Sequence, residues 1–153
     1  MKNKCFEEFF NAYLTCALWS STDTKENGEM LEGLDQEYTI EDIDHDSIET
    51  MKKDCLKFFN ENRQCFNYSE KTCQDRLIRK DKETGKLIYI EETNTYNKYT
   101  QAGYDFWLTR NGHGCGFWSR DELNKETKDL LTQKAKEFKE QYLYIGDDNK
   151  IYC

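Results

Sequence analysis

The run GYDFWLTRNGHGCGFW, from Gly103 to Trp118, is the stretch around which the fold is expected to form. Asp105–Arg110 is rich in aromatic residues and is interpreted as a strand. Asn111-Gly112 follows it, and both residue types tolerate the positive φ that a type I′ turn needs. Cys115–Trp118 is interpreted as a short return strand. The sequence therefore predicts a β-hairpin with a glycine-rich tip.

The chain of 153 residues is interpreted as one domain, residues 1–153, because its length matches the commonest domain size. Aromatic residues make up 14% of the chain, which argues against a disordered acidic tail although charged residues reach 34%. No run of about 20 apolar residues predicts a membrane span. Charges at positions 2, 4, 7 and 8 leave no apolar segment for a secretory signal. No membrane partner is expected.

Apolar residues at three- and four-residue steps predict three amphipathic helices. The first spans Cys5–Ser20. The second begins at Asp46, which forms a capping-box pattern with Glu49, and ends near Asn62. The third opens with the capping-box pattern Ser119–Glu122. The predicted core residues are Phe6, Phe9, Phe10, Tyr13, Leu14 and Ala17 in the first helix, Ile48, Met51, Cys55, Phe58 and Phe59 in the second, and Leu123, Leu130, Leu131, Ala135, Phe138 and Tyr142 in the third.

Alternating apolar residues on either side of turn residues predict two further hairpins. Leu77–Arg79 pairs with Lys86–Ile90, and Tyr142–Ile145 pairs with Lys150–Tyr152. Residues 93–100 are expected to form a loop. Because helices and hairpins are segregated rather than alternating, the sequence predicts an α+β fold. The expected architecture has three amphipathic helices packed on a small antiparallel sheet of β-hairpins.

Residues 26–49 hold ten acidic side chains and no Lys or Arg. The rest of the chain carries 20 acidic and 22 basic residues, so this segment accounts for the whole net charge of −8. Such a concentration creates a negative field that favours a basic partner. Three interpretations stay open: a solvated loop, a surface that imitates the phosphates of nucleic acid, and a calcium loop beginning at Asp42, Asp44 and Asp46. Against calcium, Ser47 and Lys53 replace the Gly and Glu that the loop needs.

The seven cysteines are an odd number in a chain with no export signal, so we expect free thiols rather than disulfides. Cys65 and Cys73 lie eight residues apart, no CxxC occurs, and the two histidines are isolated, so no zinc site is predicted. Cys16 and Cys55 are interpreted as small core residues. The sequence predicts no metal site and no cofactor.

The tip of the predicted central hairpin could carry chemistry of its own. His113 lies two residues from Cys115, so the two could share a face of an extended segment and form a nucleophilic pair, with the glycine amides as oxyanion partners. Alternatively, Arg110, His113 and those amides could form an anion nest for a phosphate or nucleotide. The basic segment 76–86, with nearby tyrosines, could offer a weak nucleic-acid surface. The acidic residues between its bases favour a solvated hairpin instead.

Four motifs together resemble a small family of tailed-phage proteins, most of whose members are known only as hypothetical. They are Tyr13–Ser21 (YLTCALWSS), Asp105–Gly114 (DFWLTRNGHG), Gly116–Trp118 (GFW) and Tyr142–Asp148 (YLYIGDD). Cys115 stands where that family usually has Ala, and Ser119 where it often has Asp. Residues 60–100 look longer than the corresponding connection, which indicates a family-variable insertion. The resemblance implies a phage or prophage origin and action in the cytoplasm of the infected bacterial host, and supplies no catalytic residues.

The charge pattern and the resemblance together predict a non-enzymatic accessory protein that inhibits a host defence factor, a CRISPR effector or a restriction enzyme, by binding it. Such factors hold nucleic acid in basic channels that an acidic surface can occupy. Direct nucleic-acid binding is not expected at a net charge of −8. The predicted partner-binding residues are Glu37, Glu41, Asp42, Asp44, Asp46 and Glu49 in the acidic segment, with Trp107, Arg110, Asn111 and His113 in the hairpin.

Overall fold

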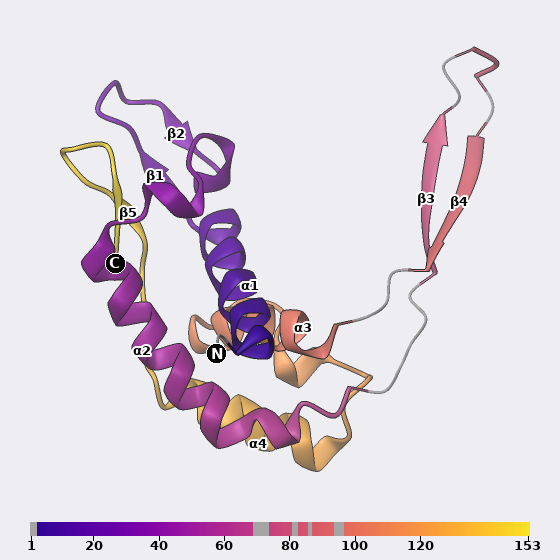
Figure 1. Ribbon diagram of the computed structural model, residues 1–153. Coiled ribbons are helices and arrows are strands. Elements are labelled where there is room, and N and C mark those ends of the chain that lie inside the picture. Colours follow the sequence, from indigo (N-terminus) through magenta and orange to yellow (C-terminus); the bar gives the residue numbers. More distant parts are fainter. Residues whose placement is uncertain (1–2, 69–73, 81–82, 86, 94–96) are drawn as a thin grey trace.

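The computed structural model describes residues 3–68, 74–80, 83–85, 87–93 and 97–153 (Figure 1). The described part contains four α-helices: α1 (Lys4–Ser20), α2 (His45–Asn62), α3 (Lys98–Arg110) and α4 (Lys125–Lys136). Short 3₁₀ helices are η1 (Leu34–Gln36), η2 (Ile40–Asp42), η3 (Arg63–Cys65) and η4 (Phe117–Ser119). The strands are β1 (Asp23–Thr24), β2 (Met30–Leu31), β3 (Gln74–Lys80), β4 (Leu87–Thr93), β5 (Tyr144–Ile145) and β6 (Ile151–Tyr152).

The core lies between the helices and is dominated by aromatic rings. Phe106 of α3 stacks on Phe58 of α2 with ring centroids 4.1 Å apart. The α1 and α3 backbones approach closely at Gly103, where an added side-chain carbon would stand 2.2 Å from the Phe9 carbonyl oxygen. Only a residue without a side chain allows this separation. The predicted stripes of α1 and α2 are confirmed, because Phe9, Tyr13, Met51 and their neighbours on these helices are buried.

The predicted strand at Asp105–Arg110 is wrong, because these residues form the second half of α3. Every residue of this range is buried, so this half of the helix has no exposed face and its sequence lacks the amphipathic period. Asn111-Gly112 ends the helix instead of turning a hairpin. Gly112 has φ 68°, and His113 N–H donates to the Leu108 carbonyl at 3.0 Å, which is the Schellman arrangement of a helix end. The predicted return strand at Cys115–Trp118 is also wrong, since η4 lies there.

The other helices differ from their predicted starts by a few residues. Asp44, and not Asp46, caps α2, because its carboxylate accepts a hydrogen bond from Ser47 N–H at 3.2 Å. Asn124 caps α4 in the same way, through Thr127 N–H at 2.8 Å. The predicted capping box at Ser119 therefore does not open a helix. Ser119 belongs to η4.

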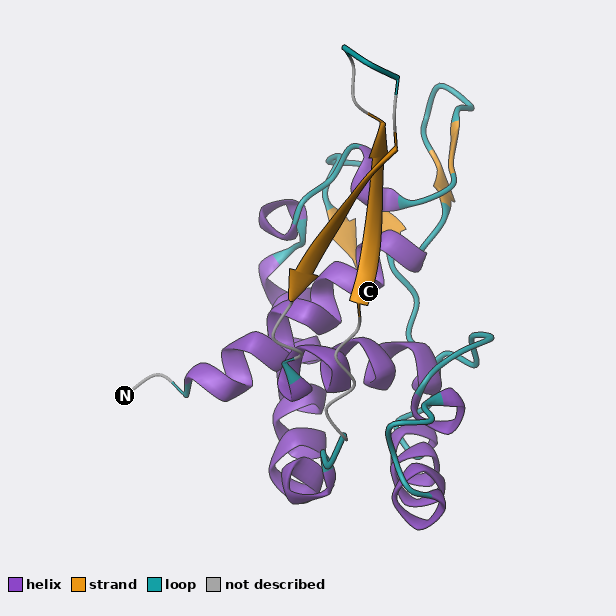
Figure 2. Cartoon of the chain, turned by 90° about the vertical axis from the view of Figure 1, so that its right-hand side faces the viewer, coloured by secondary structure: helices purple, strands orange, loops and turns teal. Residues whose placement is uncertain are grey.

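The strands form three separate two-stranded antiparallel pieces, β1–β2, β3–β4 and β5–β6 (Figure 2). Two hairpins lie where they were predicted but with other bounds: β3 pairs with β4, with Leu77 opposite Ile90, and β5 pairs with β6 over two residues each. Lys86, predicted to start the second strand of the first hairpin, lies outside the described residues. The fold is α+β, but the prediction that the helices pack on one sheet of hairpins is wrong. The helices pack on one another and share one hydrophobic core.

The remaining sequence predictions concern connections. The loop predicted for residues 93–100 begins in β4 and ends in α3, and residues 94–96 lie outside the described residues. The β1–β2 hairpin was not predicted.

Among the described helices, none combines the length and the apolar character that crossing a membrane requires.

Candidate functional site

The acidic segment 26–49 and the C-terminal hairpin meet at one end of the molecule. In Figure 1, β1, β2 and β5 lie together where α1 ends and α2 begins. Tyr38 Oη donates to Asn149 Oδ1 at 2.6 Å, and Asp44 N–H donates to the Ile151 carbonyl at 2.8 Å. The turn at 146–149 adds Asp147 and Asp148, which are both exposed. We call this surface, residues 26–49 with 146–149, the acidic end.

Most acidic side chains of the segment face solvent. Eight of the ten belong to exposed residues, and only Asp42 and Asp44 are half-buried. Lys25 pairs with two of the exposed carboxylates, Glu29 at 3.2 Å and Glu37 at 2.9 Å. Of the predicted partner-binding acids, Glu37 is therefore already paired with a base.

Asp42 and Asp44 have local structural roles. Asp42 accepts a hydrogen bond from Thr39 N–H at 2.8 Å at the start of η2, and Asp44 caps α2. Glu41, Asp46 and Glu49 are exposed, and within the described part of the chain no basic side chain lies in ion-pair contact with them. Of the predicted partner-binding acids, these three are the ones available to a partner.

The described residues contain no group of three or more His, Cys, Asp or Glu side chains placed to hold a metal ion. The calcium-loop pattern at Asp42, Asp44 and Asp46 is divided between η2, the cap of α2 and the first turn of α2. The carboxylates of Asp42 and Asp44 accept hydrogen bonds from backbone amides.

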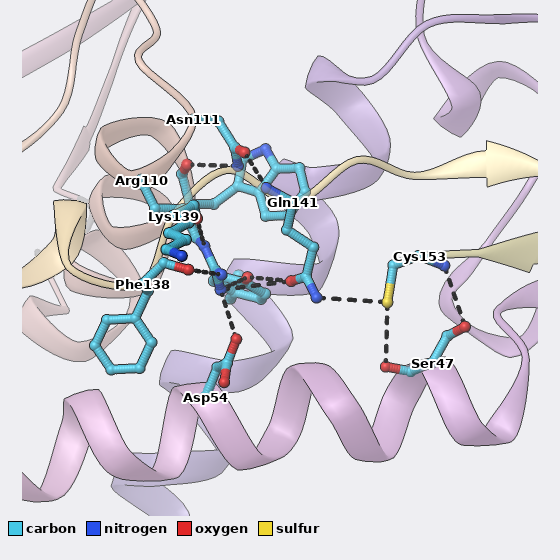
Figure 3. Close-up of polar contacts among 10 residues, drawn as sticks. Ser47, Asp54, Arg110, Asn111, Phe138, Lys139, Gln141 and Cys153 are labelled. Carbon is cyan, nitrogen blue, oxygen red and sulfur yellow. Dashed lines mark hydrogen bonds and ion pairs between the residues drawn. The ribbon is translucent and has the colours of Figure 1, made fainter.

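Arg110 is a core residue that ties three helices to the segment before β5 (Figure 3). Its guanidinium donates to the carbonyl oxygens of Phe138 and Lys139, at 2.9 and 3.0 Å. It also donates to Tyr13 Oη at 2.9 Å and to Asp54 Oδ2 at 3.1 Å. Its side chain is only 2% exposed, and these partners occupy all three of its nitrogens. The predicted anion nest at Arg110 is therefore wrong.

The other predicted hairpin residues are divided between the core and the loop after α3. Trp107 is 2% exposed, and its indole N–H donates to Ser20 Oγ at 2.7 Å, so it cannot anchor a partner from the surface. Asn111 is half-buried and holds Gln141, because its Oδ1 accepts from Gln141 N–H at 2.8 Å. His113 is half-buried and Cys115 is exposed. The two do not share a strand, and no hydrogen bond joins them in the described structure.

A second buried charge was not predicted from the sequence. Asp105 of α3 is fully buried and accepts two hydrogen bonds from Arg120, at 2.9 and 2.7 Å, through one carboxylate oxygen. Tyr68 Oη and Gln101 Nε2 supply further donors at 2.8 and 3.1 Å. Burial raises the pKa of the Asp105 carboxyl, against the opposing effect of Arg120. Tyr68 and Arg120 are 37 and 15 residues away in the sequence, so sequence spacing gave no signal for this pair.

A cavity of about 440 Å³ lies beside this pair, between α1, η1 and α3. Its walls include Trp19, Asp35, Gln101, Cys115 and Arg120. Cys16 lies in the same wall, and burial raises the pKa of its thiol to about 12. The cavity therefore combines an exposed indole, a carboxylate and a paired guanidinium.

Comparison of the chain with protein-family models, with curated proteins and with solved structures finds no match.

Proposed function

We propose that this chain is a binding protein whose acidic end occupies the basic, nucleic-acid-binding surface of another protein and thereby inhibits it. The observation that carries the proposal is the concentration of exposed, mostly unpaired carboxylates at one end of the molecule. The resemblance to tailed-phage proteins suggests the partner class: a host defence factor such as a CRISPR effector or a restriction enzyme. Such factors bind polyphosphate chains in channels lined by Lys and Arg.

Charge of one sign, gathered on one surface, accelerates encounter with a surface of opposite sign and fixes its orientation. Affinity also needs buried contact, which aromatic and long apolar side chains commonly provide. Tyr144 is 50% exposed on β5, and Met30 is 66% exposed on β2. Met30 belongs to the acidic end and Tyr144 lies on the strand that leads into its 146–149 turn, so both are better placed to anchor a partner than the buried Trp107.

The alternative proposal, a phosphate-binding or catalytic site at Arg110–Cys115, has less support. It depends on a cationic side chain at the loop, whereas the Arg110 guanidinium lies in the core with its donors used. Among the described residues of this loop, no other observation supports a site for a phosphate group.

The test is a charge reversal with a matched control. Glu41, Asp46 and Glu49 are replaced together by Lys, which leaves the caps Asp42 and Asp44 intact. The control variant reverses Glu61, Asp121 and Asp129, which are also exposed and lie outside the acidic end, so both variants change net charge equally. Thermal unfolding of both variants checks that the fold survives.

Each protein is immobilised and used to capture proteins from a nuclease-treated lysate of a bacterial host. The proposal predicts that wild type and the control variant retain a nucleic-acid-binding protein that the acidic-end variant loses. A DNA or RNA duplex added as competitor should release it, because both ligands would use the same basic surface. Capture that is equal for all three proteins, or that no competitor affects, would overturn the proposal.

A further inference from the structure

The cavity beside Asp105 and Arg120 has a wall that suits a cation. Trp19, in the last turn of α1, lines the cavity and is 61% exposed, so much of its side chain is accessible to a ligand. An indole face attracts a guanidinium or ammonium group more strongly than the other aromatic side chains do. Asp35 of η1 lines the same cavity and supplies a carboxylate.

Gly33 brings the Asp35 carboxylate close to the end of α1. A side-chain carbon at Gly33 would stand 2.7 Å from Asp35 Oδ1 and 2.9 Å from the Trp19 carbonyl oxygen. Leu34 N–H also donates to the Ser21 carbonyl at 3.0 Å, which fixes the loop against the helix. The backbone before η1 is therefore held close to the end of α1, the turn that carries Trp19.

The charges around the cavity leave one carboxylate without a counterion. Arg120 is neutralised by Asp105 through two hydrogen bonds, so this pair contributes little net charge. Within the described structure no basic side chain forms an ion pair with Asp35. Gln101 donates its amide N–H to Asp105, which leaves its carbonyl oxygen as an acceptor. The uncompensated polar groups of the wall thus favour a cationic donor.

A neighbouring cavity of about 500 Å³ continues the groove toward the acidic end. The two cavities share Thr15 and Asp35, and Glu41 lines the second one. A chain segment that crosses both would meet carboxylates at Asp35 and at Glu41. Two carboxylates along one path favour a basic segment with more than one cationic residue.

We propose that the cavity between Trp19 and Asp35 binds an arginine side chain of the partner protein. The guanidinium lies over the Trp19 indole and donates to the Asp35 carboxylate, a geometry that its planar fork of donors can satisfy. This inference rests on the proposed function and names the contact that a basic partner surface makes. It also accounts for an exposed Trp19 beside an unpaired carboxylate.

The experiment titrates the intact, ¹⁵N-labelled protein with the peptide acetyl-Gly-Arg-Gly-amide and follows the indole N–H signals. Trp19→Phe assigns the Trp19 signal, and the buried Trp107 signal reports that the fold is unchanged. We expect saturable shifts of Trp19 with a Kd of about 1–10 mM, as befits a single small contact. The same peptide with citrulline, which keeps the shape but lacks the charge, should produce no saturable shift.

The matched variants are Asp35→Asn and Glu32→Gln, because Glu32 is an exposed acid of the same segment outside both cavities. Asp35→Asn should weaken peptide binding at least about tenfold, and Glu32→Gln should leave it unchanged. Equal shifts with citrulline, equal affinity of Asp35→Asn and wild type, or no saturable shift would overturn the arginine site. A saturable shift with adenosine monophosphate in place of the peptide would assign the cavity to a nucleotide instead.

The titration needs no partner protein, so its outcome is separate from that of the capture experiment. If the peptide binds but the acidic-end variant captures the same proteins as wild type, the proposed function is rejected and the arginine site stands. Capture that depends on the acidic end, with no peptide binding, would reject only the arginine site.

Discussion

Gly103 of α3 lies against Phe9 of α1 so closely that an added side-chain carbon would stand 2.2 Å from the Phe9 carbonyl oxygen. We therefore expect Gly103→Ala to force the two helices apart and to lower the free energy of unfolding by about 3 kcal/mol. Chemical denaturation measures the change. Gly114→Ala is the control, because nothing lies within 4 Å of the added carbon, and it should change stability by less than about 0.5 kcal/mol.

Arg110→Lys should destabilise the protein although it keeps the charge. A lysine ammonium cannot donate at once to the Phe138 and Lys139 carbonyls and to Tyr13 and Asp54, as the guanidinium does. We expect a loss of about 3 kcal/mol, because buried acceptors lose their donors. Arg63→Lys, at an exposed position, should be nearly neutral. If denaturation gave the same midpoint for both variants, the structural role of Arg110 would be wrong.

The corrected start of α2 gives a paired test of helix capping. Asp44→Ala removes the carboxylate that accepts from Ser47 N–H, so unfolding should become about 1 kcal/mol easier. Asp46→Ala removes only a favourable charge in the first turn, so its effect should stay below about 0.5 kcal/mol. Denaturant titration of both variants ranks them. A larger loss for Asp46→Ala would restore the cap that the sequence pattern predicted.

The cysteines should differ in reactivity as their environments differ. Burial raises the pKa of Cys16 to about 12, so at pH 8 about one thiol in 10,000 is ionised, and burial also raises the pKa of Cys55. Cys115 is exposed. In the folded protein at pH 8, iodoacetamide should modify Cys115 and spare Cys16 and Cys55, as measured by peptide mass spectrometry. In urea all three should react, and equal rates without urea would contradict the structure.

Local patterns predicted the positions of α1 and α2 and of two hairpins, because each depends on residues close in sequence. In the third predicted helix, Leu131 and Ala135 are buried, whereas Leu130 and Tyr142 are exposed. Phe6, Phe9 and Tyr13 recur at helical spacing, and that stripe forms the buried face of α1. The β3–β4 and β5–β6 hairpins follow from alternation around turn residues. The arrangement of the hairpins could not be predicted in this way. No sequence pattern within a hairpin indicates whether it joins the other hairpins in one sheet or stays separate.

The central motif was mispredicted because the second half of α3 is buried on every side and carries no helical period. Phe106, Trp107 and Leu108 are all buried, so apolar residues surround the helix instead of lining one face. Asn111-Gly112 favours both a hairpin turn and a helix end, and only the tertiary structure selects between them. The same error affected the predicted partner-binding site. Most of its acidic carboxylates lie on the surface, whereas Trp107 and Arg110 lie in the core.

The Asp105–Arg120 pair and the Trp19–Asp35 cavity could not be found from sequence spacing. Each joins residues that are 15 or more positions apart, through the crossing of α1 and α3 and the packing of η1. Gly33 is the one residue near η1 whose type relates to this contact, because its lack of a side chain lets the chain before η1 approach the end of α1.

The salt dependence of binding tests the central claim, that the acidic end binds a basic surface, most directly. The captured partner is purified, and its affinity is measured at rising salt for wild type, the acidic-end variant and the control variant. The account predicts a steep fall for wild type and the control, because binding releases counterions, and a shallower slope with weaker binding for the acidic-end variant. Equal slopes and equal affinities for all three proteins would contradict it.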